Sequence, residues 1–230
     1  MTDPAAAYKQ QAAEAAVGEV RSGMAVGLGT GSTAVFATRR IGALLADGTL
    51  HDLTCFATSK ETEREAEALK IPLLGPALDR TLDVTIDGAD EVDPSLDLIK
   101  GGGGAHLREK IVAQATEREL IVVDESKLSD RLGTKRAVPL EVLELGWSSQ
   151  ARYATALGAA VTVRMAPDGS RSRTDQGNLV LDADFGPIED APALAAALDA
   201  RAGIVAHGLF LGLASAVVVA GTDGVRWLTP

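Results

Sequence analysis

The stretch "MAVGLGTGST", Met24 to Thr33, is an apolar segment that runs directly into glycines and hydroxyl residues. The apolar part predicts a short buried strand, and the helical pattern that begins at Val35 predicts a strand-to-helix junction at the glycines. Glycines let a ligand approach the backbone closely, and the first turn of a helix offers free N–H groups to an anion. The junction therefore predicts an anion-binding loop in an α/β fold.

Strand-like and helix-like segments alternate through the first 130 residues. Expected helices cover residues 5–21, 35–45, 59–70 (with Ser59 as N-cap) and 106–117, and expected strands cover 53–58, 83–90, 97–100 and 119–127. Such alternation is typical of a parallel sheet covered on both faces. We therefore expect an α/β protein with a Rossmann-like parallel sheet and helices on both faces.

The pattern changes after Leu132. Strand-like segments at 137–145, 159–166 and 178–186 accompany helix-like segments at 147–158 and 191–201, with an exposed hairpin loop at 167–177. Residues 133–207 are thus predicted to form a smaller α+β insert domain. The segment "SAVVVAGTDGVRWL" resembles the first region, so residues 1–132 and 208–230 are predicted to form the Rossmann-like domain.

Composition restricts the ligand classes. The chain has 230 residues, a formal net charge of -10 and 3% aromatic residues, which disfavours binding to nucleic acid. Lysines and helix N-termini can still attract a small anionic ligand locally. The single cysteine, Cys55 in "LTCFA", is predicted to be a buried inert thiol, and a reducing cytoplasm is the expected location. The N-terminal segment lacks the features of a signal peptide.

One segment is long enough to span a membrane. Gly203 to Thr222 contains no Asp, Glu, Lys or Arg over 20 residues. Its glycines, its histidine and the lack of a flanking aromatic or basic belt favour two buried strands with a tight connection instead. We expect no membrane partner.

The glycine loop at 27–33 matches no nucleotide fingerprint. The dinucleotide pattern G-x-G-x-x-G fails at Ser32, and the acid expected after the second strand is replaced by Thr58 and Ser59. The G-K-[ST] of a Walker A loop occurs nowhere in the chain. A loop for a phosphate monoester fits best, with a simple tight turn as the alternative.

The segment "DGADEVD", Asp87 to Asp93, follows a strand predicted near the centre of the sheet. Ligands of open α/β sheets bind beyond the carboxyl ends of the strands, so Asp87 and Asp90 could share one site. A solvated acidic turn and a divalent-metal loop are the alternatives. The EF-hand spacing is absent, because position 12 is Leu98 instead of Glu.

The segment "KGGGGAHLREK", Lys100 to Lys110, places a lysine at another strand end, directly before four glycines. Four consecutive glycines lose much conformational entropy on folding, so they indicate either a linker or a close approach to the backbone. Their position between ordered elements disfavours the linker. Glu109 falls early in the next helix, although Arg108, Glu109 and Lys110 could also form a solvated face.

A further strand end carries Asp124 and Lys127, and a lysine there could reach a phosphate. The three histidines, His51, His106 and His207, do not have the spacing of metal ligands. These strand ends together favour acid–base chemistry on a small phosphorylated metabolite, without a metal or a redox cofactor.

The motifs "GLGTGSTA", "DGADEVD" and "KGGGGAHLREK", in this order and spacing, resemble the ribose-5-phosphate isomerase family of the A type. "DESK", "NLVLD", "VAHGLF" and "VVVAGTDGV" extend the resemblance over essentially the whole chain. One departure is Leu209 to Ser215, which is more apolar than the turn expected there. The resemblance implies interconversion of ribose 5-phosphate and ribulose 5-phosphate, no metal or cofactor, and a homodimer or dimer of dimers.

The resemblance also implies roles for individual residues. Glu109 would be the base that moves a proton between C1 and C2, and Asp87 and Asp90 would bind sugar hydroxyls and assist ring opening. Lys100 would stabilise the enediolate oxygen with backbone N–H groups of Gly101, Gly102 and Gly103. The substrate, mainly its phosphate end, would be held by Lys9, Thr30, Gly31, Ser32, Thr33 and Lys127, with Gly88 and Ala89 also in contact with it.

Two alternatives use the same fold. A sugar-phosphate sensor would bind without turnover and would usually carry a basic DNA-reading segment, which this chain lacks. A coenzyme A transferase would need a nucleophilic carboxylate that forms a thioester. An assay for ribulose 5-phosphate separates both from the isomerase.

Overall fold

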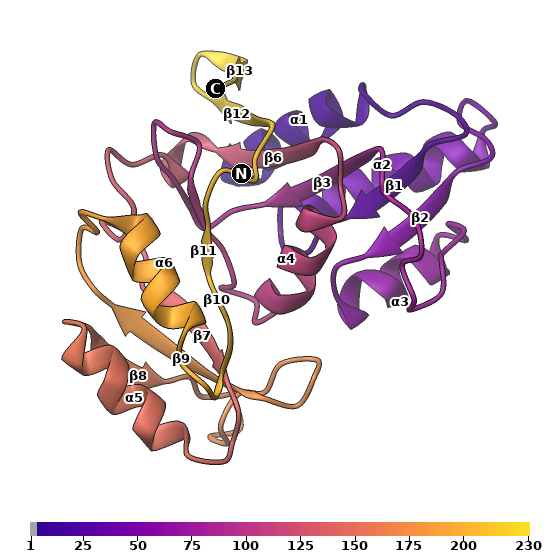
Figure 1. The fold of residues 1–230 in the computed structure, drawn as a ribbon. Helices are drawn as coiled ribbons and strands as arrows, with labels where there is room; N and C mark the ends of the chain where they lie inside the picture. Colours follow the sequence, from indigo (N-terminus) through magenta and orange to yellow (C-terminus); the bar gives the residue numbers. More distant parts are fainter. Residues whose placement is uncertain (1–3) are drawn as a thin grey trace. The chain divides into compact units, whose positions relative to one another are not determined.

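The computed structural model describes residues 4–230, which divide into two compact units (Figure 1). Unit 1 contains the chain up to Ala89, Arg108–Lys127 and Leu213–Pro230, and unit 2 contains Asp90–Leu107 and Leu128–Gly212. The sequence-based division assigned residues 90–107, 128–132 and 208–212 to the Rossmann-like domain instead. The structure places these segments in unit 2 because strand pairing joins them to one another and to that unit.

Unit 1 is built on a six-stranded sheet in the order β13-β12-β6-β3-β1-β2. Neighbouring strands are parallel except β12 and β13, which form an antiparallel hairpin. The strands are β1 (Ala25–Leu28), β2 (Thr54–Ala57), β3 (Val84–Gly88), β6 (Glu119–Asp124), β12 (Ala216–Gly221) and β13 (Gly224–Leu228). The predicted α/β class with a mainly parallel sheet is confirmed, and the segment after residue 215 does return to this sheet.

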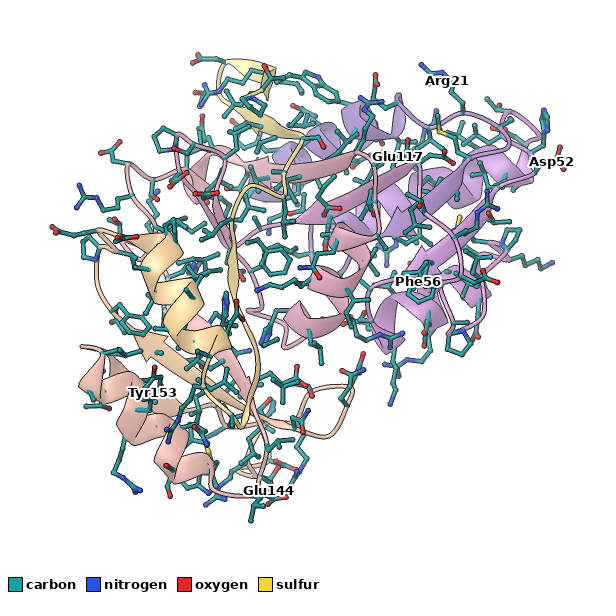
Figure 2. The ribbon with its side chains drawn as sticks, in the orientation of Figure 1. Arg21, Asp52, Phe56, Glu117, Glu144 and Tyr153 are labelled. Atoms are coloured by element: carbon teal, nitrogen blue, oxygen red, sulfur yellow. The ribbon has the colours of Figure 1, made fainter. Side chains whose placement is uncertain are left out.

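Helices cover both faces of this sheet, and alternation along the strands decides which residues face which helix. Val26, Leu28 and Ile86 point into the larger core cluster, which also contains residues of α1 (Pro4–Val17), α2 (Ala34–Ala46) and α3 (Lys60–Ala68). Ala25 belongs to a smaller cluster on the other face with Val112 of α4 (His106–Gln114) and with Phe56, which is labelled in Figure 2.

A local sequence signal explains where α3 begins. The Ser59 side chain accepts a hydrogen bond from the Thr62 N–H, as expected for the N-cap of α3.

Cys55 is fully buried, and burial raises the pKa of its thiol to about 12. The inert thiol predicted from the sequence is therefore confirmed, since a thiolate would be the reactive form.

Unit 2 contains two antiparallel sheets. The larger has the order β10-β7-β9-β8 and packs against α5 (Trp147–Ala156) and α6 (Ala191–Asp199), and the smaller has the order β11-β5-β4. The strands are β4 (Glu91–Val92), β5 (Leu98–Ile99), β7 (Val138–Val142), β8 (Ala160–Val163), β9 (Leu179–Asp184), β10 (Ile204–His207) and β11 (Leu209–Phe210). Tyr153 of α5, labelled in Figure 2, donates to the Ala197 carbonyl of α6.

The apolar segment 203–222 forms three short strands, β10, β11 and β12, where the sequence predicted two. The additional break lies at Gly208, whose N–H donates to the Pro139 carbonyl. A Cβ at Gly208 would lie 2.3 Å from the Lys100 carbonyl oxygen, so only glycine fits there. Within residues 4–230, no helix has the length and apolar character needed to cross a bilayer.

Candidate functional site

The first glycine loop joins β1 to α2 in unit 1 and lies directly against β3. The Gly29 N–H donates to the Ile86 carbonyl, and a Cβ on Gly29 would come within 2.4 Å of Asp87 Cα. Gly31 adopts a φ of 104°, which non-glycine residues rarely adopt. Gly29 therefore allows the close approach to β3, and Gly31 allows the turn into α2.

Hydroxyl groups stabilise this loop from the side of β2 and α3. Thr30 Oγ1 lies 2.7 Å from Thr58 Oγ1 and 3.1 Å from Thr62 Oγ1. The Thr62 hydroxyl also donates to the Gly29 carbonyl. The hydroxyl of Thr30, predicted to bind substrate, thus has an evident role within the fold. Thr33 is buried at the N-cap position of α2 and makes no side-chain capping bond.

Ser32 is the exposed hydroxyl of the loop, and a lysine accompanies it. Lys9 Nζ of α1 donates to Ser32 Oγ at 3.1 Å, so the structure brings together two residues that the family resemblance implied as ligands of the substrate phosphate. A neighbouring cavity of about 300 Å³ is lined by Gly31 and Ser32, and also by carboxylates of α3. An anion is therefore expected at the loop N–H groups and Lys9 rather than against α3.

Asp87 is the last residue but one of β3 and is 1% exposed, which excludes the solvated acidic turn as an interpretation for this residue. Its Oδ1 accepts hydrogen bonds from the N–H groups of Thr30 (2.9 Å) and Gly88 (2.7 Å). Asp87 therefore connects the glycine loop of β1 to the end of β3, and the peptide of Gly88 is part of that connection.

Glu109 lies in the first turn of α4 and is 6% exposed, so it does not belong to a solvated face. It precedes by three residues Val112, whose side chain packs against the sheet, and residues three apart share a helix face. Asp87 points to the same side of β3 as Thr85, which contacts Thr116 just after α4. Asp87 and Glu109 therefore both belong to the side of the sheet that α4 covers.

The neighbours of Glu109 have other roles. Arg108 forms an ion pair with Glu63 of α3 at 2.5 Å. Lys127 is half-buried in the 3₁₀ turn η1 (Glu125–Lys127), directly after β6, which is the strand next to β3. Asp124 accepts from the Ser126 N–H at 3.0 Å, which shapes that turn. The ends of β1, β3 and β6 thus carry the predicted side chains at one edge of the sheet. The expected fourth strand end is not part of this edge, because β5, which precedes Lys100, pairs with β4 and β11 in a separate sheet.

Lys100 follows β5 in unit 2 and is 3% exposed. Its backbone N–H donates to the Gly208 carbonyl, and its Nζ lies 5.5 Å from the centre of the Phe210 ring. A cation above an aromatic face is stabilised by the ring quadrupole. The apolar segment that departs from the expected turn thus supplies Leu209 and Phe210, both buried, to β11 beside β5.

The second glycine loop, Gly101–Gly104, is held by charged side chains. The Gly102 N–H donates to Asp90 Oδ2 at 2.7 Å, and Arg164 Nη1 donates to the carbonyls of Gly101 (2.9 Å) and Gly102 (3.0 Å). Gly103 is exposed, and a Cβ placed on it would meet no heavy atom within 4 Å. Of the N–H groups expected to hold an oxygen, that of Gly102 is therefore already engaged by Asp90.

Sequence reasoning did not single out Glu91 or Arg164. Glu91 is fully buried and accepts from the Ser129 hydroxyl and from the N–H groups of Gly133, Lys135 and Arg136. It is therefore a structural acid inside the acidic motif. Arg164 lies just before a loop that the sequence identified only as an exposed hairpin, so no local pattern marks its contact with residues 101–102.

His106 is fully buried beneath the second loop, where a Cβ on Gly101 would lie 2.7 Å from His106 Nδ1. Among residues 4–230, no three His, Cys, Asp or Glu side chains are grouped so that they could hold a metal ion.

A mainly parallel sheet whose carboxyl edge carries a glycine and hydroxyl loop, buried acids and a lysine defines a Rossmann-like protein with a site for a small anionic ligand. The family model of ribose 5-phosphate isomerase A (phosphoriboisomerase A) matches residues 54–224. The chain belongs to this family.

Relatives agree with this assignment over nearly the full length. The ribose-5-phosphate isomerase A of Desulfatibacillum aliphaticivorans is 55% identical over 220 residues, which is 96% of each chain. The ribose 5-phosphate isomerase of Plasmodium falciparum has a TM-score of 0.94 and 38% identity over 98% of this chain and 99% of its own. A D-ribose-5-phosphate isomerase in complex with phospho-erythronic acid has a TM-score of 0.95 and 34% identity, over 97% of this chain and 98% of its own.

Proposed function

We propose that the protein interconverts D-ribose 5-phosphate and D-ribulose 5-phosphate, an aldose–ketose isomerisation of the pentose phosphate pathway. The observation that carries this proposal is family membership over nearly the whole chain, in a protein whose Asp87 and Glu109 are both buried. A buried acid early in a helix, after a glycine loop, is suited to abstract a proton from carbon.

Glu109 is the proposed base. It removes the proton from C2 of the open-chain aldose, which leaves a 1,2-enediolate, and returns the proton to C1 while the hydroxyl proton passes from O2 to O1. Burial favours this role, because desolvation of a carboxylate makes it a stronger base towards a weak carbon acid. Asp87 and Asp90 bind sugar hydroxyls and assist ring opening, and the peptides of Gly88 and Ala89 contact the sugar.

The enediolate oxygen requires donors where its charge develops. Lys100 is the proposed cation, and its burial supports the role, since a partly desolvated ammonium interacts more strongly with an anion than a hydrated one. Gly101, Gly102 and Gly103 provide the neighbouring backbone. Because the Gly102 N–H is engaged by Asp90, the exposed Gly103 peptide is the better candidate for a direct contact.

The phosphate is proposed to bind at the N-terminus of α2, at Gly31, Ser32 and Thr33, with Lys9 and Lys127. The 3.1 Å contact between Lys9 and Ser32 supports this assignment. Thr30 then acts mainly by holding the loop to Asp87 through its N–H.

We further propose that the reaction needs no metal or cofactor, and that the protein is a cytoplasmic homodimer or dimer of dimers. Light scattering on the purified protein tests the assembly, and a monomer at micromolar concentration would contradict it.

The decisive assay mixes EDTA-treated protein with ribose 5-phosphate and follows formation of ribulose 5-phosphate. Turnover supports the isomerase. Binding of ribose 5-phosphate without turnover would support the sugar-phosphate sensor instead. Activity that EDTA abolishes and a divalent metal restores would contradict the acid–base scheme.

A further inference from the structure

Arg164 and Asp182 form an ion pair in unit 2 that is more constrained than an ordinary pair across two strands. Asp182 lies in β9, opposite Thr162 of β8, and Arg164 stands two residues beyond Thr162 on the same face. Such diagonal pairs are common across antiparallel strands. This pair is bidentate, with Nε and Nη2 of Arg164 each donating to one oxygen of Asp182, and both side chains are largely buried.

The remaining terminal nitrogen of Arg164 contacts the second glycine loop. Nη1 donates to both the Gly101 carbonyl (2.9 Å) and the Gly102 carbonyl (3.0 Å). A guanidinium has five N–H groups in a rigid plane, and four of them are used by these contacts. Asp182 therefore fixes the plane of the guanidinium, and that plane fixes two consecutive carbonyls.

Fixing these carbonyls also orients the next two N–H groups. In a planar trans peptide, the N–H of the following residue points away from the carbonyl, and no peptide of the described chain is cis. The peptide between Gly101 and Gly102 shows the result, since its carbonyl meets Arg164 while its N–H meets Asp90 at 2.7 Å. By the same geometry, the Gly103 N–H is directed away from Arg164. A cation at the carbonyl ends also polarises both peptides, which strengthens their N–H groups as donors.

We propose that Arg164, held by Asp182, is a positioning residue for the isomerisation. It orients the glycine peptides so that Asp90 and the Gly103 N–H contact the reacting oxygens of the substrate. The inference rests on the proposed function. Glycines alone would leave this loop with many conformations of similar energy, and a preorganised donor loses its advantage when it must be ordered during the reaction.

The test compares Arg164→Gln with the matched variant Arg173→Gln. Arg173 also joins a carboxylate, that of Glu144, to a glycine carbonyl, that of Gly177, within unit 2, but it makes neither contact to the second loop. We expect Arg164→Gln to lower kcat by roughly 10- to 100-fold, since small misplacements of catalytic groups have effects of this size. KM for ribose 5-phosphate should change by less than about threefold, because the phosphate contacts remain. Arg173→Gln should match the wild type.

A purely structural role predicts a different pattern. Phospho-erythronic acid carries a planar carboxylate where the enediolate carries its charge, so its inhibition constant reports the oriented donors. We expect this constant to rise in Arg164→Gln by about the same factor as kcat falls. A fall in kcat with an unchanged inhibition constant would mean only a smaller folded fraction, and would overturn the proposal.

Two more variants test the pair as a unit. Arg164→Lys keeps the charge but not the fork, so it should recover at most part of the lost kcat. Asp182→Asn should lower kcat, and combining it with Arg164→Gln should add little, because the two residues act through the same peptides. Additive losses, or wild-type kcat in Arg164→Gln, would overturn the inference while leaving an active isomerase. A wild-type protein without isomerase activity would overturn the proposed function itself.

Discussion

The two glycine loops of this protein use the same residue for different purposes. In the first, Gly29 allows β1 to approach β3, and the loop is held by backbone hydrogen bonds and threonine hydroxyls. In the second, a Cβ added to Gly103 would meet no heavy atom, and one added to Gly102 would meet only the Asp90 side chain. This loop is held by Asp90 and Arg164. Gly29 in the first loop removes a clash with backbone, whereas Gly102 and Gly103 in the second loop leave the orientation of their peptides mainly to charged neighbours.

The largest expected effect tests whether the second loop leads to the catalytic base. Glu109→Gln preserves shape but cannot accept a proton from carbon, so kcat should fall by roughly 10²- to 10⁴-fold. KM should change little, and exchange of the C2 hydrogen with deuterated water should stop. Glu63→Gln, which removes only the ion-pair partner of Arg108, is the control and should retain kcat. A Gln variant with more than about a tenth of wild-type turnover would move the role of base to Asp87, Asp90 or His106.

The next effect tests the steric part of the comparison. Gly29→Ala would place a Cβ 2.4 Å from Asp87 Cα, and backbone cannot move aside cheaply. We expect a loss of about 3 kcal/mol, the upper range for overpacking, which corresponds to a fall of about 6–12 °C in Tm. Gly103→Ala meets no heavy atom and has no positive φ, so its Tm should stay within about 2 °C. Equal melting temperatures for the two variants would remove the distinction between the loops.

A smaller effect tests the first loop as the phosphate site. Lys127→Ala and Lys9→Ala should each raise KM for ribose 5-phosphate by about tenfold, the equivalent of one charge-assisted hydrogen bond, with little change in kcat. Arg40→Ala, an exposed cation of α2, is the control. Ribose without phosphate should be a poor substrate for the wild type. If the lysine variants lowered kcat and left KM unchanged, the first loop would take part in the chemistry rather than in binding.

The smallest effect concerns the sheet that supports Arg164. Glu141 of β7 is fully buried and accepts from the Thr174 hydroxyl and Asn178 Nδ2, and burial raises its pKa although these hydrogen bonds partly oppose the shift. A raised carboxyl pKa means that the folded state binds the proton more tightly, so Glu141 favours folding below its unfolded pKa. That contribution is lost as pH rises through the folded pKa.

Glu141→Gln removes this titration. The stability of the Gln variant relative to wild type should therefore increase as the pH rises above about 4.3, the ordinary pKa of a glutamate, as measured by urea denaturation at each pH. Asp223→Asn, at an exposed turn outside the sheet, controls for general effects of pH. A difference between Gln variant and wild type that stays constant with pH would show that Glu141 titrates alike in both states.

Much of the fold could be predicted because the signals were local. The glycine and hydroxyl residues after Met24–Leu28, the Ser59 cap and the strand ends at Asp87 and Lys127 each follow from a short pattern. The three-strand course of residues 203–222 could not, because the break at Gly208 is imposed by Pro139 and Lys100, which are distant in sequence.

The candidate site divides in the same way. The residues proposed for chemistry lie in motifs, but the distinction between Thr30 and Ser32 depends on which hydroxyl the fold itself uses. Arg164 reaches residues 101–102 across more than sixty positions of sequence (62 and 63), so only the folded chain reveals it. Likewise, only the fold shows that Glu91 accepts hydrogen bonds from residues 129–136, which identifies it as a structural acid inside the acidic motif.

The place of β12 in the sheet of unit 1 has a consequence for biosynthesis. β12 is buried along its whole length between β6 and β13, yet it leaves the ribosome only after all of unit 2. Until then, β6 presents an unpaired apolar edge to solvent, and such edges recruit other chains. Contacts this distant in sequence also close slowly. The nascent chain is therefore most prone to aggregate just before residues 216–221 emerge, and synonymous codon changes that slow translation there should lower the soluble yield without altering the finished protein.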